Sequence, residues 1–257
     1  MKKITLLILL GIVSFKSFCQ YLPADMKAGL KGNLLYVATT SYYNHPKDIS
    51  ARDIQVFDRQ GLFIKYIMYD TANKVQTDFT FQYDRSGRLL SYKEYKEKIM
   101  QAKTVNVYDN YDRVVLQNIY LYSYGYPNSH FKLKKCTYKY NKAGLPVEVY
   151  VDQYGIDIRP YREYFSYNAK GQRITDLREP FAMTPGHMNT YTYNKHGDMI
   201  QRITTSSESD SYSDTTRYEY NGYDNAGNWH QKKEFHLIDG IKEARDVTIR
   251  KITYFKK

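Results

Sequence analysis

The sequence has little cysteine, no catalytic signature and few aliphatic residues for its length. Only two cysteines occur in 257 residues, so a disulfide framework does not organise the fold. There is no Gly-x-Ser-x-Gly elbow, phosphate-binding loop or His-Glu-x-x-His motif. The six histidines are scattered and lack the acidic neighbours that a zinc site needs. We therefore predict a protein that is not an enzyme and holds no cofactor or metal.

Tyrosine is the residue that the chain has in excess. It occurs 29 times, and aromatic residues make up 16% of the sequence. Aromatic and β-branched residues favour strands, because their side chains fit a pleated and half-buried surface. The composition therefore predicts an all-β chain that buries ring surface on its sheet instead of building a thick aliphatic core.

Residues 1–19 have the pattern of a secretory signal peptide. Two lysines precede an apolar stretch at 4–13, and the small residues Ser17 and Cys19 lie just before a cleavage site ahead of Gln20. The apolar stretch is shorter than the roughly 20 residues of a membrane-spanning helix. We expect export to the periplasm, the outer surface or the medium, with no transmembrane segment in the mature chain.

A lipoprotein acylated at Cys19 is the less favoured alternative. Lys16 and Phe18 stand where a lipobox has an aliphatic and a small residue. Loss of residues 1–19 removes three lysines and no acid, which lowers the formal charge from +11 to +8. Cys136 then remains alone, and we expect a buried thiol, with an intermolecular disulfide as the alternative.

One short phrase organises the rest of the chain, and residues 81–89 are its clearest copy. The aromatic residues at 79, 81 and 83 alternate with polar ones, as in a half-buried strand. Asp84 suits the first position of a turn, because its side chain can accept a hydrogen bond from the backbone two residues on. Gly87 suits a turn position that needs positive φ. The phrase predicts strand, turn and strand.

The phrase recurs to give seven copies, at steps of 26, 25, 32, 27, 26 and 30 residues from aromatic to aromatic. Periods in this range indicate a repeat architecture. In the third copy, Asp112 stands where the glycine is expected. One acid in each turn supplies too few oxygens for calcium, so we assign these residues to turn formation. The repeat-defining residues are Phe57, Asp58 and Gly61; Tyr83, Asp84 and Gly87; Tyr108 and Asp109; Tyr140, Asn141 and Gly144; Tyr167, Asn168 and Gly171; Tyr193, Asn194 and Gly197; and Tyr223, Asp224 and Gly227.

These copies resemble the YD repeat of the rearrangement hot spot (RHS) family, whose pattern is Tyr-x-Tyr-Asp-x-x-Gly-Arg-Leu. Residues 81–89 match this pattern closely, and the copy that ends at Trp229 resembles the Gly-Asn-Trp form of secreted bacterial members. The resemblance covers roughly residues 50–257 and implies an all-β repeat scaffold, often described as carbohydrate-binding. Large members enclose a toxin and carry a core motif near a cleavage site. Neither feature is found here, so we do not transfer the toxin-shell function.

The predicted organisation has three parts. Residues 1–19 are the signal peptide, 20–50 a leader with a capping strand, and 51–257 the hairpin repeats, closed by a strand at 247–255. A spiral and a closed shell are alternatives to an open meander. Because seven units are few for a closed shell, we predict a long, twisted antiparallel sheet of about seven hairpins, open or curled.

The tyrosines of the phrase are expected to form a cross-strand ladder. Tyrosines outside the phrase are better candidates for ligand binding, because an exposed ring can stack on a sugar while its hydroxyl forms a hydrogen bond. The candidate ligand-binding residues are Tyr120, Tyr122, Tyr124, Tyr126, Tyr150, Tyr154 and Tyr161.

The positive charge is spread over every unit, and its ordinary explanation is a solvated face that prevents aggregation. Outside the cell, acidic glycans are more natural partners than nucleic acid, which we do not expect. We predict a binding or scaffold protein of the cell envelope whose partners are glycans or an envelope protein. The alternative is a purely structural or protein–protein interaction element without a small ligand. An enzyme acting on envelope sugars would need two carboxylates facing each other across a cleft.

Overall fold

The computed structural model describes residues 30–43, 48–123, 126–154, 159–180, 185–206, 213–238 and 241–255. Within these ranges the chain forms sixteen β-strands. The strands are β1 (Leu34–Tyr43), β2 (Ile49–Phe57), β3 (Phe63–Tyr69), β4 (Val75–Tyr83), β5 (Leu89–Lys96), β6 (Ile99–Tyr108), β7 (Val114–Ser123), β8 (Tyr126–Tyr140), β9 (Pro146–Gln153), β10 (Tyr161–Tyr167), β11 (Arg173–Arg178), β12 (His187–Tyr193), β13 (Met199–Ser206), β14 (Ser213–Tyr223), β15 (Trp229–Ile238) and β16 (Ile241–Tyr254).

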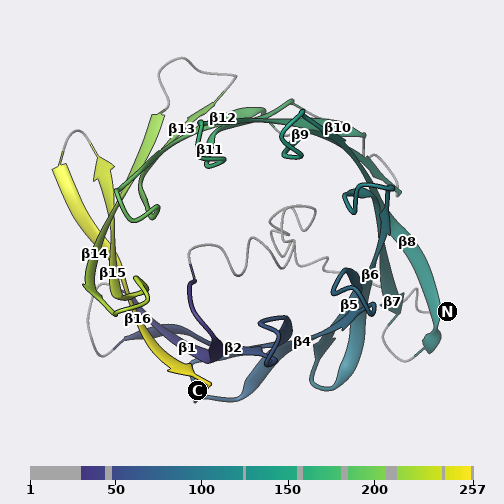
Figure 1. Cartoon of the computed structure of the whole chain (residues 1–257), viewed down its shortest axis with the longest axis horizontal. Coiled ribbons are helices and arrows are strands. Elements are labelled where there is room, and N and C mark those ends of the chain that lie inside the picture. The colour runs from purple at the N-terminus through teal and green to yellow at the C-terminus, as the bar shows by residue number, and fades with distance from the viewer. Residues whose placement is uncertain are drawn as a thin grey trace, which may run out of the picture.

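The strands close into one antiparallel barrel, in which each strand lies beside its neighbours in sequence. β1 completes the barrel because it pairs with β2 on one side and with β16 on the other. Figure 1 shows a wide ring of strands, with the hairpin turns at one rim lying inside the circle. The all-β antiparallel prediction is confirmed, but the predicted open, twisted sheet of seven hairpins is wrong.

The seven intact turns share one geometry, which the second copy illustrates. The Asp84 N–H donates to the Arg88 carbonyl at 2.9 Å, and the Gly87 N–H donates to the Asp84 carbonyl at 3.1 Å. The Asp84 side chain accepts from the N–H groups of Ser86 and Arg88, both at 2.9 Å. Gly87 has φ +84°, and Asp112 takes the corresponding conformation at +59° without being glycine.

An eighth turn is assembled from the two ends of the described chain. The Phe255 N–H donates to the Asn33 carbonyl at 3.0 Å, which is the bond that joins the first and fifth residues of each intact turn. Gly32 takes the glycine position with φ +90°. Tyr254 pairs with Leu34, as the last aromatic of each intact hairpin pairs with the first residue after the turn. The ring therefore contains eight equivalent hairpins, one of them split.

The split hairpin explains why a count of contiguous repeats in the sequence gives too few hairpins for the ring. Neither half of the eighth phrase is complete in the sequence, so only seven copies are visible. A register shift accompanies the turn in all but one of the hairpins, the split one included. Such bulges bend and twist strands. Their accumulated curvature returns β16 to β1, and the closed wall avoids the exposed edges that favour aggregation.

A ladder of tyrosine hydroxyl groups ties successive hairpins together. Each hydroxyl donates to the backbone carbonyl at the start of the second strand of the preceding hairpin, at 2.6 to 2.9 Å. The donor and acceptor pairs are Tyr83 with Phe63, Tyr108 with Leu89, Tyr140 with Val114, Tyr167 with Pro146, Tyr193 with Arg173, and Tyr220 with Met199. Each such bond contributes about 0.5 to 1.5 kcal/mol net.

The last intact hairpin departs from this pattern. Tyr220 takes the ladder position there instead of Tyr223. Gly222, with φ +66°, lies between them, and this hairpin is the one without a register shift beside its turn. The Tyr223 hydroxyl instead donates to the Asp198 carboxylate at 2.8 Å, and the Tyr223 ring stacks on His196 at a centroid distance of 4.3 Å. Tyr223 thereby joins two neighbouring turns.

Alternate residues of the wall lie on two different faces. On one face, which we call the packed face, neighbouring side chains bury one another, as Phe79, Phe81 and Tyr92 do on β4 and β5. On the other, the open face, residues such as Thr80 are exposed.

Cys136 lies on the packed face and is fully buried, but it is not a free thiol. The expected burial is confirmed and the expected free thiol is not. Cys19 lies outside the described residues.

Candidate functional site

The structure brings two of the candidate tyrosines together on the open face. Tyr120 on β7 pairs with Lys132 on β8, and the Lys132 ammonium lies 5.5 Å from the centroid of the Tyr154 ring. Lys103 on β6 pairs with Tyr120 from the other side. Tyr154 exposes 41% of its surface. We call Lys103, Tyr120, Lys132 and Tyr154 the Tyr–Lys patch.

The other candidate tyrosines are distributed between the two faces. The Tyr150 ring lies under the Arg162 guanidinium at 5.3 Å, and Tyr122 pairs with His130. Tyr161 is on the packed face with 2% exposure. Tyr124 and the side chain of Tyr126 lie outside what the structure describes.

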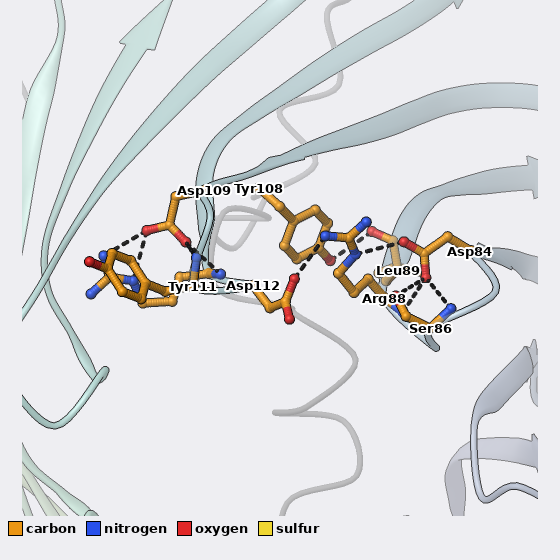
Figure 2. Close-up of polar contacts among 9 residues, drawn as sticks. Asp84, Ser86, Arg88, Leu89, Tyr108, Asp109, Tyr111 and Asp112 are labelled. Carbon is orange, nitrogen blue, oxygen red and sulfur yellow. Dashed lines mark hydrogen bonds and ion pairs between the residues drawn. The ribbon is translucent and has the colours of Figure 1, made fainter.

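Charged side chains link the turns to one another at the rim (Figure 2). The Arg88 guanidinium contacts the Asp84 carboxylate at 2.6 Å and the Asp112 carboxylate of the next turn at 2.8 Å. It also lies 5.4 Å from the ring centroid of Tyr108. In the next turn, Arg113 contacts Asp109 at 2.6 Å.

The pKa directions agree with a structural role for this network. The pKa of Asp84 is lowered by hydrogen bonds from the Arg88 backbone, the Ser86 hydroxyl and the Arg88 side chain. The Arg88 pKa is raised, chiefly by its hydrogen bond to Asp84. Ion pairs this exposed add little to stability, because solvent screens them. The contact of Arg88 with Asp112 joins two neighbouring turns.

The packed face changes in character around the ring. From β1 to β10 it carries three apolar clusters, which contain residues such as Phe57, Tyr92, Val151 and Phe165. We call this region the apolar arc. From β11 to β16 the corresponding alternate positions are mostly polar or charged, and we call this region the polar arc. Its main residues are Asp176, Asn189, Arg202, Thr204, Asp214, Thr216, Lys232, Glu234, His236, Asp246 and Arg250.

A hydrogen-bond chain fixes the first part of the polar arc. The Asp176 carboxylate accepts from the Asn189 amide at 2.7 Å and from the Tyr191 hydroxyl at 2.5 Å. The Asn189 carbonyl in turn accepts from the Thr204 hydroxyl at 2.6 Å. Asp176 is additionally 3.9 Å from Arg173. Asp176 is thus fully engaged by residues of its own wall.

A groove opens beside this chain. Its wall is formed by Pro185, Gly186, His187, Asn189, Arg202, Thr204 and Ser206, and its volume is about 400 Å³. Arg202 donates one hydrogen bond, to the Thr216 hydroxyl at 3.3 Å, while its buried Nε atom has no partner. Among the described residues, no carboxylate forms an ion pair with Arg202. Burial lowers the pKa of His187, with a further contribution from Arg178.

Charges gather again across β14, β15 and β16. His236 lies 3.8 Å from Asp214 and 3.6 Å from Glu234, and its Nε2 is 2.7 Å from the Arg245 guanidinium. The pKa of Asp246 is raised by burial and by the Glu234 charge. Among the described residues, no group of three or more His, Cys, Asp or Glu side chains could hold a metal ion.

The polar arc meets the apolar arc at the β1–β16 seam. Asp53 and Arg250 both pair with Thr39, on opposite sides of β1. Burial raises the pKa of Asp53 to about 6, against a hydrogen bond from Thr39 and the charge of Arg250. The Arg250 guanidinium lies 3.5 Å from the centroid of the Trp229 ring, and burial lowers its pKa to about 10.

Comparison with known proteins gives a shared fold. No family model and no curated protein matches the chain. A porin-like protein from Bacteroides uniformis ATCC 8492 is similar in structure, with a TM-score of 0.56 and 9% identity over 86% of this chain and 96% of that one. At this identity the match shows the fold alone. The chain also aligns with 12% of a chain of the Photorhabdus luminescens Tc holotoxin pore, at a TM-score of 0.36 and 13% identity, too low to carry an argument.

One further observation concerns helices. In the part of the chain that the structure describes, no helix has the length and hydrophobicity needed to cross a bilayer.

The polar arc is the feature that residue patterns did not reveal. Charged and polar residues at alternate strand positions, such as Arg202 and Thr204 on β13, look like an ordinary solvated face in the sequence. The available signal was that both alternate sets of β13 to β16 are polar, so one face of each strand had to pack polar groups. Only the cross-strand register shows which of these groups face one another.

Proposed function

We propose that the chain is an exported, non-enzymatic binding protein of the cell envelope, shaped as a ring, that binds carbohydrate at the Tyr–Lys patch. The observation that supports this best is the position of Lys132 between Tyr120 and the exposed ring of Tyr154. A tyrosine ring offers an apolar surface to a sugar face and a hydroxyl for hydrogen bonding. The ammonium groups of Lys103 and Lys132 favour acidic glycans.

The charge distribution supports a ring that works with both faces of its wall in water. The open face carries Lys103, Lys135 and Arg217 within strands, while the packed face carries Glu163 and Arg202. A wall that faces lipid needs an apolar band, and an arginine or lysine near its middle costs about 2 to 4 kcal/mol. The porin-like neighbour shares the fold only, so we do not transfer a pore function from it. We expect an osmotic-shock or salt-wash fraction to contain the protein, whereas recovery only with detergent would contradict this part of the proposal.

The binding proposal is tested with residues 20–257 on a glycan array at low and at physiological salt. We expect binding to defined glycans that persists at physiological salt, and that Tyr154→Ala weakens by at least about fivefold, since one aromatic stacking contact contributes on the order of 1 kcal/mol. Tyr111→Ala is the matched control, because Tyr111 exposes 78% of its surface and lies under Arg113 at 4.9 Å in the turn between β6 and β7, whereas Tyr154 follows the opposite end of β9. Equal losses in both variants, or no binding at either salt, would refute the proposal.

A purely structural or protein-binding element is the second candidate. It is favoured by the gathering of the hairpin turns inside one rim of the ring (Figure 1), where Arg88 and Asp112 join neighbouring turns. This candidate predicts no glycan binding and an envelope protein that is co-purified after crosslinking in cells. Loss of that partner on substitution of rim residues, with the Tyr–Lys patch intact, would distinguish it from the glycan proposal.

A further inference from the structure

We propose that the groove beside Arg202 on the packed face is a binding site for the anionic group of an acidic sugar. This site is separate from the Tyr–Lys patch, which lies on the open face of β6 to β9. A test of this site is therefore independent of the test of the glycan proposal made above.

The charge of Arg202 is the first support for this site. Arg202 is half-buried, and cations withdrawn from water are normally paired, because removing a charge from water is costly. Here Nε is buried without a partner, and the one hydrogen bond of the guanidinium goes to the neutral hydroxyl of Thr216. Asp176, a carboxylate of the same wall, is already held by Asn189, Tyr191 and Arg173. An anion from outside would supply the missing counter-charge.

The lining of the groove is the second support. Asn189 gives one amide hydrogen to Asp176 and its carbonyl oxygen to Thr204, which leaves the second amide hydrogen without a partner among the described residues. The Thr204 hydroxyl donates to Asn189 and keeps lone pairs for a ligand hydroxyl. Donors near Arg202 suit a carboxylate or sulfate, and the mixed donors and acceptors beside them suit sugar hydroxyls.

The size of the groove limits the ligand. A volume of about 400 Å³ falls within the range of small-ligand sites. It can hold one or two sugar rings, with the chain continuing into solvent. Because the groove is open and Asn189, Arg202 and Thr204 are among its lining residues, we expect recognition through hydrogen bonds and charge, with a strong dependence on salt.

The experiment measures binding of trigalacturonate to residues 20–257 by isothermal titration calorimetry at low and at physiological salt. Maltotriose is the neutral probe of equal length, and inorganic sulfate is the free anion. We expect trigalacturonate to bind and maltotriose not to. Arg202→Gln should weaken binding by about tenfold or more, since a charged hydrogen bond is lost. Arg217→Gln should change it less than about twofold, because Arg217 is on adjacent β14 but on the open face.

Thr204→Val provides a second variant that retains the charge and nearly the volume of the groove. It should weaken trigalacturonate binding by about threefold to tenfold while leaving the circular dichroism spectrum unchanged, so it keeps the test valid if Arg202→Gln does not fold. Equal affinity of wild type and both variants would overturn the proposal. It would also be overturned by equal losses in Arg217→Gln, or by sulfate binding without any binding of trigalacturonate.

Discussion

The apolar arc and the polar arc have the same backbone arrangement, but the side chains on their packed faces differ. Both are built from hairpins with one turn geometry and one tyrosine ladder. Yet the apolar arc buries residues such as Phe57 and Val151, while the corresponding rows of the polar arc bury Thr216 and Asp176. The turns and the ladder therefore suffice to set the curvature of the wall, and the packed face is free to vary. Variation of that kind allows one region to stabilise the ring while another binds a ligand.

The two arcs also differ in where stability comes from. Burying aliphatic and aromatic side chains contributes about 1.5 to 3 kcal/mol for each residue. Buried charges lose hydration and regain most of it through their partners, so they add little net stability. We therefore expect the apolar arc to carry most of the free energy of unfolding.

The largest expected effect tests this difference directly. Phe57→Ala should lower the free energy of unfolding by about 3 to 5 kcal/mol, because it leaves a cavity beside Phe63. Thr216→Val, at an equally buried position of the polar arc, should cost no more than about 1 to 2 kcal/mol, because it removes the hydrogen bond from Arg202 without leaving a cavity. Urea denaturation measures both. Comparable losses in the two variants would show that the arcs contribute equally.

A pH effect is expected at the boundary between the arcs. The pKa of Asp53 is about 6 in the folded chain, against 3.8 for an unperturbed aspartate, so the folded state binds the proton more tightly. The stabilisation of the folded state by this proton is complete below pH 4. It is lost as the pH rises through 6, which lowers the free energy of unfolding by up to about 3 kcal/mol. Asp53→Asn should remove that part of the slope, although Arg250 then loses its counter-charge. Thermal unfolding from pH 4 to 7 measures the change, with Asp78→Asn on the open face as control. A slope in Asp53→Asn equal to that of the wild type would refute the assignment.

The tyrosine ladder should contribute equally to the free energy of unfolding in both arcs. Tyr140→Phe and Tyr193→Phe each remove a hydroxyl and leave one carbonyl without its partner, those of Val114 and Arg173. We expect each to cost about 1 to 2 kcal/mol in urea denaturation. A cost confined to one arc would mean that the ladder is not the shared element that the geometry indicates.

The smallest expected effect concerns the turns. Gly144 has φ +76°, and a Cβ atom there would meet nothing within 4 Å. Gly144→Ala should therefore cost about 1 kcal/mol through backbone conformation alone. Lys142→Ala in the same turn is the control, and it should stay within about 0.5 kcal/mol of wild type. If both variants match wild type in thermal unfolding, the left-handed turn position is less restrictive than we infer.

The sequence predicted the units of the fold well and their closure badly. Turn positions follow from local chemistry, because Asp84 and Gly87 act within five residues of one another. Closure depends on Gly32 and Tyr254, which are far apart in the chain. Neither residue belongs to a complete copy of the repeated phrase in the sequence. The replacement of Tyr223 by Tyr220 in the ladder could not be predicted, because Tyr223 stands at the same place in the phrase as the other ladder tyrosines.

The candidate site shows the same limit. Residue type singled out Tyr154 and Tyr161 together, but the period of two cannot say which face of a strand packs. Tyr161 proved to be buried and Tyr154 exposed. The unpaired charge of Arg202 could not be recognised from sequence at all, because it depends on what β12 and β14 place opposite β13.

The split eighth turn has a consequence for the order in which the ring forms. Its two halves come from opposite ends of the described chain, and contacts such as that between Lys31 and Asn228 span 197 positions. The seven intact hairpins can form locally, whereas the final joint must wait for the last strand and closes the largest loop. Until then, β1 and the growing end both present unpaired edges. The polypeptide is therefore most exposed to misassembly just before completion, and the rate of that last step governs how long the exposure lasts.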